Sequence, residues 1–193
     1  MELRSIYWFR NDLRLSDNLS LNKALDNSKY ILFLFVDDES NRQYTSWEFM
    51  RTDAHRETFI NQGISSLDKA LKSYGHSLHV LKGNTVEILN KIVQEHHIDS
   101  IFCEEIAASE ENEQIKVLKK LNVNIKSIFQ SSLFNIKQLP FDIKNMPDVF
   151  TKFRKCMELE KIEPNNPEQL SDNIKNILPI NFNSTKIIVK KIY

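Results

Sequence analysis

The chain has 193 residues, of which 41% are hydrophobic and 27% are charged, and its 26 Lys and Arg residues balance its 26 Asp and Glu residues. This length suits one domain with an extension, or one large domain, and it is sufficient to bury a hydrophobic core. The net charge of zero gives no electrostatic reason to expect direct, non-specific binding to nucleic acid.

The two cysteines, Cys103 and Cys156, lie far apart and match no zinc or redox spacing, which fits a reducing cytoplasm. The chain opens with an apolar strand pattern instead of the basic-then-apolar pattern of a secretion signal. No apolar run approaches the roughly 20 residues that a membrane span needs. We therefore expect a soluble, cytoplasmic protein with no membrane partner.

Five short apolar runs predict strands, at residues 5–9, 30–36, 77–81, 98–103 and 125–129. Their continuous character is typical of strands that are covered by helices on both faces. Segments with helical periodicity separate them, at residues 18–27, 47–74, 84–95 and 110–121. Gly75 stands where a C′ glycine would end the second helix. This alternation predicts an α/β fold: a Rossmann-like, open, five-stranded parallel sheet with helices on both faces.

The alternation of predicted strands and helices stops after Gln130, so we expect the α/β domain to span residues 1–130. Residues 131–160 contain two prolines, then a short basic amphipathic helix over 149–159. Residues 161–193, with three prolines and many asparagines, predict a linker with at most one short helix around 168–178. The last eight residues, 186–193, fit either a strand or a loose apolar-basic tail.

In an open parallel sheet, ligands bind beyond the carboxyl ends of the strands, where the strand order reverses. Arg10 and Asp12 follow the first predicted strand, and Glu104 and Glu105 follow the fourth. If these strands are neighbours, the two turns face one another across a crevice. This arrangement makes the crevice the candidate ligand site.

Structural roles explain several of these residues at least as well. The alternating charges of Arg10, Asp12, Arg14 and Asp17 fit two ion pairs that stabilise a turn. Trp8 lies within a predicted buried strand, which favours a core position over one that stacks on a chromophore.

Motifs for common cofactors are missing. With only three glycines, the chain has neither the G-x-G-x-x-G fingerprint nor a P-loop, which disfavours a generic NAD enzyme. His96 and His97 are adjacent, so on a helix they point about 100° apart and make a poor joint metal site.

Two motifs resemble one known family. Residues 7–18, Tyr-Trp-Phe-Arg-Asn-Asp-Leu-Arg-Leu-Ser-Asp-Asn, closely resemble the opening motif of the photolyase/cryptochrome family. Residues 139–158, Leu-Pro-Phe-Asp-Ile-Lys-Asn-Met-Pro-Asp-Val-Phe-Thr-Lys-Phe-Arg-Lys-Cys-Met-Glu, closely resemble the segment that leads out of the N-terminal α/β domain of DASH-type cryptochromes. The resemblance runs from about Tyr7 to Glu158.

The resemblance implies an antenna domain. In that family the α/β domain can house a chromophore, usually a folate (methenyltetrahydrofolate) or a deazaflavin, whereas a larger helical domain holds FAD, the electron-transfer tryptophans and the DNA lesion pocket. The match stops before that helical domain. It therefore implies a context of light-driven DNA repair or blue-light sensing in which this chain alone has no photolyase (lyase) activity, because the flavin carries the chemistry.

Folate-binding members use a carboxylate early in the helix after the fourth strand, which corresponds to Glu110 or to Glu111 here. With Arg10, Asp12 and Glu105, these residues form the candidate cofactor site that the resemblance suggests. The resemblance also implies a separately encoded FAD domain as the docking partner, and contact with DNA only indirectly.

Two alternatives stay open. One is a Rossmann-like nucleotide-binding domain with a phosphate at the start of the helix at Asn18. The other is a ligand-free interaction remnant.

Overall fold

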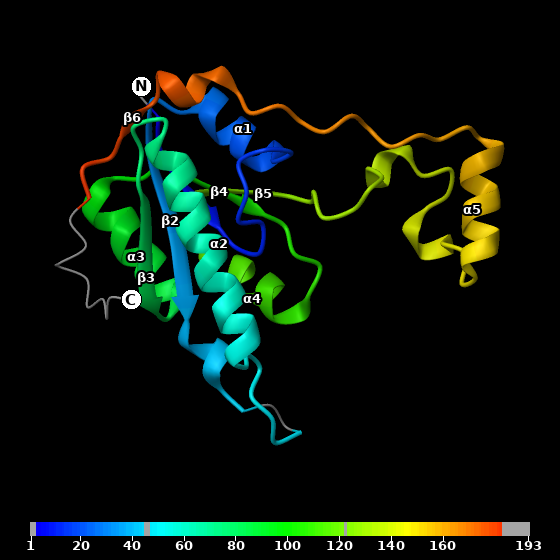
Figure 1. The fold of residues 1–193 in the computed structure, drawn as a ribbon, viewed down its shortest axis with the longest axis horizontal. Coiled ribbons are helices and arrows are strands. Elements are labelled where there is room, and N and C mark those ends of the chain that lie inside the picture. Colours follow the sequence, from blue (N-terminus) through cyan, green and yellow to red (C-terminus); the bar gives the residue numbers. More distant parts are fainter. Residues whose placement is uncertain (1–2, 45–46, 122, 183–193) are drawn as a thin grey trace.

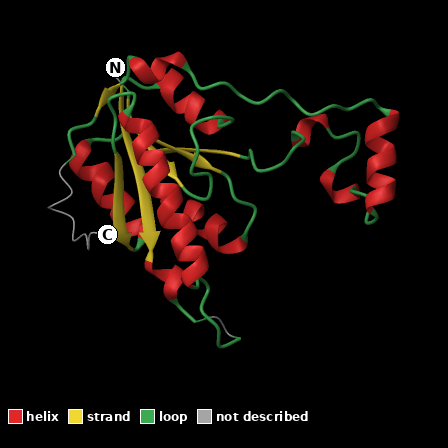
Figure 2. Ribbon diagram, viewed as in Figure 1, coloured by secondary structure: helices red, strands yellow, loops and turns green. Residues whose placement is uncertain are grey.

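The computed structural model describes residues 3–182 except 45, 46 and 122, so the predicted tail at 186–193 lies outside the described residues. Five parallel strands lie in the order β3-β2-β1-β4-β5 (Figures 1 and 2), which confirms the predicted α/β fold. The strands are β1 (Arg4–Phe9), β2 (Tyr30–Asp38), β3 (Leu78–Gly83), β4 (Ser100–Glu104) and β5 (Asn124–Ile128).

Helices cover both faces of this sheet, as the continuous apolar strands predict. Along β1, Tyr7 and Phe9 belong to the core beneath α1 and α2, whereas Ile6 and Trp8 belong to the core beneath α3 and α4. Successive strand residues point to opposite faces, so β1, β2, β3 and β4 each contribute to both cores. The helices are α1 (Leu19–Asn27), α2 (Ala54–Lys72), α3 (Thr85–His96) and α4 (Ser109–Leu118).

Helix α2 is shorter than the predicted helix at 47–74. It begins at Ala54, whose backbone N–H donates to the side chain of the N-cap residue Asp53 at 2.7 Å. At its other end, the N–H of Gly75 donates to the Lys72 carbonyl at 3.0 Å, and Gly75 has a φ of 81°. Glycine adopts this left-handed conformation without strain, so the predicted C′ role of Gly75 is confirmed.

Residues 168–180, here called the strap, pack on the α/β domain, so the linker predicted at 161–193 is wrong for them. The one short helix predicted around 168–178 is present as a 3₁₀ helix. In the strap, β6 (Leu178–Pro179) pairs in parallel with β2 as a sixth strand, after the short 3₁₀ helix η4 (Asp172–Lys175). Ile174, Ile177 and Ile180 are at most 7% exposed. The many prolines and asparagines around them make the segment look like a linker in the sequence, although these three isoleucines are buried. Pro179 is tolerated because its neighbours donate the ladder hydrogen bonds, Leu178 to the Lys29 carbonyl just before β2 and Ile180 to the Ile31 carbonyl in β2.

Residues 131–167, here called the arm, extend away from the sheet (Figure 1). The arm has its own small apolar centre, in which the Phe141 and Phe153 rings lie 5.8 Å apart and Met157 is 5% exposed. The helix predicted at 149–159 is confirmed as α5. The elements of the arm are η2 (Ile136–Gln138), η3 (Ile143–Asn145) and α5 (Phe150–Leu159).

Candidate functional site

A cleft of about 350 Å³ opens beyond the carboxyl ends of β1 and β2. Helix α2 contributes one wall through Arg56 and Phe59, and the first turn of α4 contributes another through Glu110 and Glu111. The cleft lies where the strand order reverses, between β1 with β2 on one side and β4 on the other. The predicted ligand crevice therefore corresponds to a real cavity.

Arg10 connects the two halves of the crevice. Its Nη1 donates to the Glu104 carbonyl at 3.3 Å, and its Nη2 donates to the Glu111 carbonyl and to Gln114 Oε1, both at 3.4 Å. Burial lowers the pKa of its guanidinium. Because β1 pairs directly with β4, the expected approach of the two turns is confirmed.

The guanidinium of Arg10 also lies 4.6 Å from the centroid of the Trp8 ring. The Trp8 side chain is 3% exposed and belongs to the core beneath α3 and α4. Arg10 thus covers one face of the ring, and Trp8 is a core residue at the floor of the cleft, as the sequence favours.

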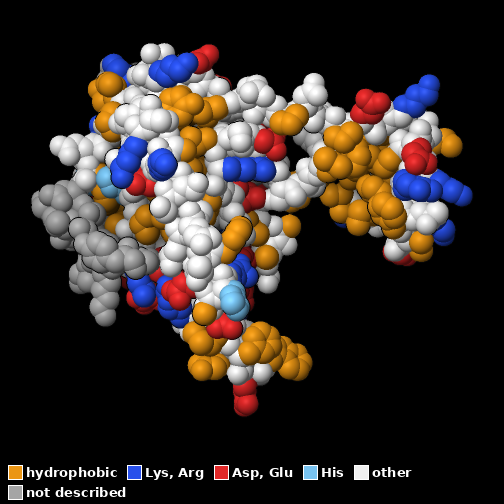
Figure 3. Space-filling model, viewed as in Figure 1, with side chains coloured by type: hydrophobic (Ala, Val, Ile, Leu, Met, Phe, Trp, Pro, Cys, Tyr) orange, Lys and Arg blue, Asp and Glu red, His pale blue; other side chains and the backbone are white. Residues whose placement is uncertain are grey.

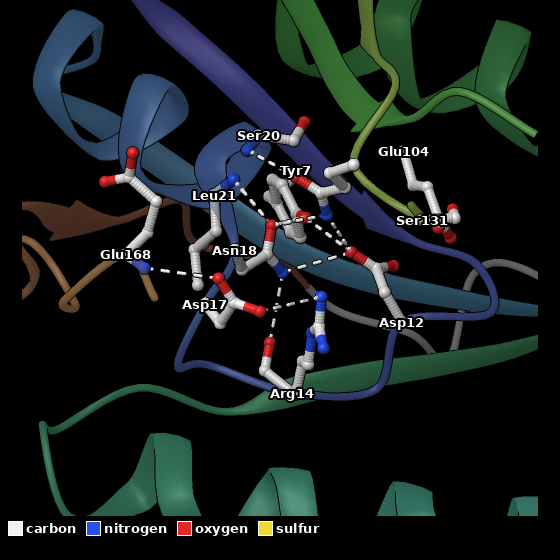
Figure 4. Close-up of polar contacts among 11 residues, drawn as sticks. Tyr7, Asp12, Arg14, Asp17, Asn18, Ser20, Leu21, Glu104, Ser131 and Glu168 are labelled. Carbon is white, nitrogen blue, oxygen red and sulfur yellow. Dashed lines mark hydrogen bonds and ion pairs between the residues drawn. The ribbon is translucent and has the colours of Figure 1, made fainter. Parts of the chain in front are cut away.

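Asp12 does not line the cleft. Its Oδ2 accepts hydrogen bonds from Gln130 Nε2 at 2.6 Å, Asn18 Nδ2 at 3.1 Å and the Tyr7 hydroxyl at 3.3 Å. Burial, and then the negative charge of Glu104, raises the pKa of Asp12 to about 6. Asp12 is therefore part of a buried polar network at the β1–α1 turn (Figure 4) and not part of the cavity wall.

The two ion pairs expected in this turn form only in part. Arg14 and Asp17 pair at 3.6 Å, whereas Arg10 donates to β4 and α4 instead of to Asp12. Among the described residues, Asp12 Oδ1 and Glu104 Oε2 are buried without a hydrogen-bond partner.

The start of α1 is closed to a phosphate. The Ser20 N–H donates to Gln130 Oε1 at 2.8 Å, and the Leu21 N–H donates to Asn18 Oδ1 at 3.0 Å. These are two of the backbone donors that would hold an anion at a helix N-terminus, and the Asp12 carboxylate lies beside them. The geometry disfavours the nucleotide-binding alternative.

The two candidate folate carboxylates have different surroundings. Glu110 is ion-paired with Arg51, and its side chain is 59% exposed. Glu111 is half-buried in the cleft wall, and its carboxylate has no hydrogen bond or ion pair among the described residues. Glu105 is exposed outside the cleft, where its backbone N–H donates to the Ile128 carbonyl at 2.8 Å. Of these three carboxylates, Glu111 is the one that lies in the cleft wall without a hydrogen bond or ion pair among the described residues.

Several residues of the cleft are not among the candidate cofactor residues chosen from the sequence. Asp38 ends β2 at the same edge as Arg10, a signal that is visible in the sequence, and it accepts from Gln114 Nε2 at 3.3 Å. Arg56 and Phe59 are one helical turn apart on α2, and Phe59 is 75% exposed. A large exposed ring on a helix has no signal in the sequence, because only the tertiary packing decides which face of α2 borders the cleft.

Among residues 3–182, with the three gaps noted above, no group of three or more His, Cys, Asp or Glu side chains could hold a metal ion. His96 ends α3, and His97 caps it with a left-handed φ of 51°. No helix in the described part of the chain is long and apolar enough to cross a bilayer.

Comparison with known proteins agrees with this architecture. The cryptochrome DASH of Synechocystis sp. is 32% identical over 161 residues, which cover 81% of this chain and 33% of the relative. The cryptochrome DASH of Idiomarina loihiensis is 30% identical over 178 residues, which cover 91% of this chain and 37% of the relative. The chain thus spans about a third of the length of these relatives.

Solved structures show the same fold. The crystal structure of the Synechocystis sp. cryptochrome matches with a TM-score of 0.84 at 28% identity, over 93% of this chain and 38% of that one. An archaeal photolyase from Sulfolobus tokodaii, described with two FAD molecules, matches in fold with a TM-score of 0.70 at 24% identity, over 88% of this chain and 37% of that one.

The family profile for DNA photolyase matches residues 5–169, which is most of the chain. This range includes both motifs that resemble the family, at residues 7–18 and 139–158. The chain therefore belongs to the DNA photolyase family and corresponds to its N-terminal α/β domain, with DASH-type cryptochromes among its relatives.

Proposed function

We propose that this chain is a cytoplasmic antenna-type domain of a DASH-like photolyase or cryptochrome, and that its cleft binds a planar chromophore of the folate type. The observation that carries this proposal is the cleft itself, which combines a volume of about 350 Å³ with the unpaired carboxylate of Glu111. A ligand site is typically a concave cavity of a few hundred Å³. This cleft has such a volume, and its walls combine apolar residues with polar and charged ones.

Glu111 supplies the polar contact that orients such a ligand. A carboxylate accepts two parallel hydrogen bonds from neighbouring N–H groups, such as the amino and ring N–H groups of a pteridine. The Phe59 ring on α2 and the apolar atoms at the ends of β1 and β2 offer surface for the flat faces of the ligand. Helix α4 also begins without a side-chain N-cap, so its first backbone N–H groups are available to a ligand acceptor.

Titration of the purified chain with methenyltetrahydrofolate tests this proposal. Binding is expected to shift the near-UV absorption of the pigment and to raise the melting temperature of the protein. FAD and ATP serve as comparison ligands, because one archaeal photolyase is described with two FAD molecules and because ATP tests the nucleotide alternative. Stabilisation by ATP alone would overturn the folate proposal, and no response to any of the three ligands would favour the ligand-free remnant.

The arm supplies the docking surface for a partner. Its exposed apolar side chains gather on the projecting part of the molecule (Figure 3), and the chain covers only about a third of its relatives. We infer that the partner is the FAD-binding helical part of a photolyase, whether it belongs to the same polypeptide or to a separate one. The exposed apolar side chains are those of Leu133, Ile136, Ile143, Met146, Val149, Phe150 and Leu159.

Light-driven DNA repair or blue-light sensing is the activity of that complete assembly, because a reduced flavin supplies the electron. The role of this chain is to absorb light and to dock. Mixing it with the helical domain of a DASH cryptochrome in sedimentation experiments tests the docking. Phe150, which is 75% exposed, is the residue to change to Asp, and exposed Thr151 on the same helix is the control.

A further inference from the structure

The arm leaves and re-enters the α/β domain at one place. Gln130 precedes the arm and Glu168 follows it, and both residues are hydrogen-bonded to the β1–α1 turn or the start of α1. Figure 4 shows Glu168 beside Asp17 in this turn. The turn spans residues 12–18, so a seven-residue segment contacts both ends of the arm.

The exit is held by side chains. Gln130 Nε2 donates to Asp12 Oδ2 at 2.6 Å and to Asn18 Oδ1 at 2.9 Å, while its Oε1 accepts from the Ser20 N–H at 2.8 Å. The next residue, Ser131, donates its hydroxyl to Glu104. Gln130 therefore uses three of its hydrogen-bonding positions on the turn and the start of α1, which leaves little freedom at the start of the arm.

The return is held by a reciprocal pair of bonds. The Asp17 N–H donates to the Glu168 carbonyl at 2.8 Å, and the Glu168 N–H donates to Asp17 Oδ1 at 3.2 Å. One turn later, Asn22 Nδ2 donates to the Gln169 carbonyl at 2.6 Å. Asp17 has a left-handed φ of 51°, a conformation that Asp tolerates better than most residues.

Between these two points, the arm makes its polar contacts with itself. Among the described residues, the hydrogen bonds and ion pairs of residues 132–166 stay within the arm, for example from Gln138 to Asn165 at 2.8 Å. In Figure 1, α5 stands apart from the sheet and its helices. The direction of the arm relative to the sheet is therefore decided at its two ends.

We propose that the β1–α1 turn is a two-ended clasp that fixes the pose of the arm, and that Asp17 and Gln130 are its positioning residues. A fixed pose presents the apolar surface of the arm to the helical partner without an ordering cost at the moment of docking. Only this benefit for docking rests on the proposed function. The pose itself is a property of the chain alone.

Distance measurements between two spin labels test the clasp in the full chain. The labels are placed at Lys69→Cys on α2 and Lys152→Cys on α5, both exposed, with Cys156→Ser to avoid a third label and Cys103 buried. Gln130→Ala opens the exit, and Asp17→Gly removes the side-chain acceptor at the return while it keeps the left-handed backbone. Gln94→Ala on α3, which loses only a bond to Asn90, is the control.

The labelled parent and the control are expected to show one narrow distance distribution. Each single variant keeps its narrow peak because the other end still holds. The double variant is expected to broaden the distribution, because only the backbone bond from Asp17 to Glu168 and the bond from Asn22 to Gln169 remain at the return. An unchanged distribution in a double variant that keeps its circular dichroism would overturn the clasp.

Hydrogen exchange on the unaltered chain is a second measurement that does not depend on the folding of a variant. The Ser20 and Glu168 amides, which contact Gln130 and Asp17, are expected to exchange as slowly as the hydrogen-bonded amides of β1. Rapid exchange at either amide contradicts a two-ended clasp.

The partner experiment separates this inference from the proposed function. The double variant is expected to bind the helical domain about tenfold more weakly, because docking must then order the arm. Its titration with methenyltetrahydrofolate should be unchanged, since neither residue lines the cleft. If the unaltered chain binds no helical domain, the proposed docking fails, while the distance and exchange measurements still decide the clasp.

Discussion

The carboxylate of Asp12 accepts a 2.6 Å hydrogen bond from the side-chain amide of Gln130, although 118 residues separate the two in the chain. Asp12 follows the first strand of the sheet, and Gln130 follows the last strand of the predicted α/β domain. This bond connects the opening motif of the family to the point where the arm begins. It places Asp12 in a structural role at the centre of a buried network and not in the wall of the cleft.

Asp12 should make the stability of the chain depend on pH. Its pKa of about 6 lies above the usual value of 3.8, so the folded chain holds the proton more tightly than the unfolded chain. Raising the pH from about 4 to about 7 therefore lowers the free energy of unfolding through this group, by up to ~3 kcal/mol. Asp12→Asn removes this contribution, so the wild type should lose stability relative to the variant as the pH rises through about 6.

Urea unfolding at several pH values between 4 and 8 measures this difference. Asp148→Asn, at an exposed residue in the arm, is the control and should track the wild type. If the difference in the free energy of unfolding between the wild type and Asp12→Asn stays constant over this pH range, Asp12 does not have a raised pKa in the folded chain.

Pigment binding should depend on Glu111 more than on Glu110. Glu111→Gln removes the charge of the free carboxylate and should weaken methenyltetrahydrofolate binding about tenfold to a hundredfold. Glu110→Gln should change it less than about threefold, because Glu110 already pairs with Arg51 on the surface. Fluorescence titration gives both values, and Glu113→Gln, one turn further along α4 and paired with Lys116, is the matched control. The reverse order of effects would assign the ligand contact to Glu110.

The strap should behave as part of the core. Ile174 is 1% exposed, so Ile174→Ala should lower the free energy of unfolding by ~2–5 kcal/mol. Leu178 in β6 is 43% exposed, and Leu178→Ala should cost less than ~1 kcal/mol. Chemical denaturation compares the two variants. Equal and small losses would show that residues 168–180 do not pack on the sheet in solution.

The two thiols should differ in reactivity. Burial raises the pKa of the Cys103 thiol to about 12, whereas Cys156 is half-buried on α5. The thiolate is the reactive form, so a thiol reagent should modify one cysteine in the folded chain and two after denaturation. Mass spectrometry counts the modified residues, and Cys156→Ser should show no modification while folded. Rapid reaction of Cys103 in that variant would contradict its burial.

The fold was largely predictable because its determinants are local. Continuous apolar runs specify strands that are buried on both faces, and the helices between them need only their own periodicity and caps such as Asn18, Asn84 and Gly75. The parallel direction of the strands follows, because each helical crossover brings the chain back to the end of the sheet at which the preceding strand began. The two family motifs were equally local, and the family assignment they suggested is confirmed.

The sequence by itself determined the α/β class, the edge of the sheet that holds the cleft, and the family. Only the tertiary structure decided that Glu111 is free while Glu110 is paired, that the strap adds a strand to β2, and that Asp12 binds the start of the arm. These three facts depend on contacts between residues far apart in the chain. Composition and periodicity describe the preferences of neighbours along the chain, so they cannot report which distant groups satisfy one another.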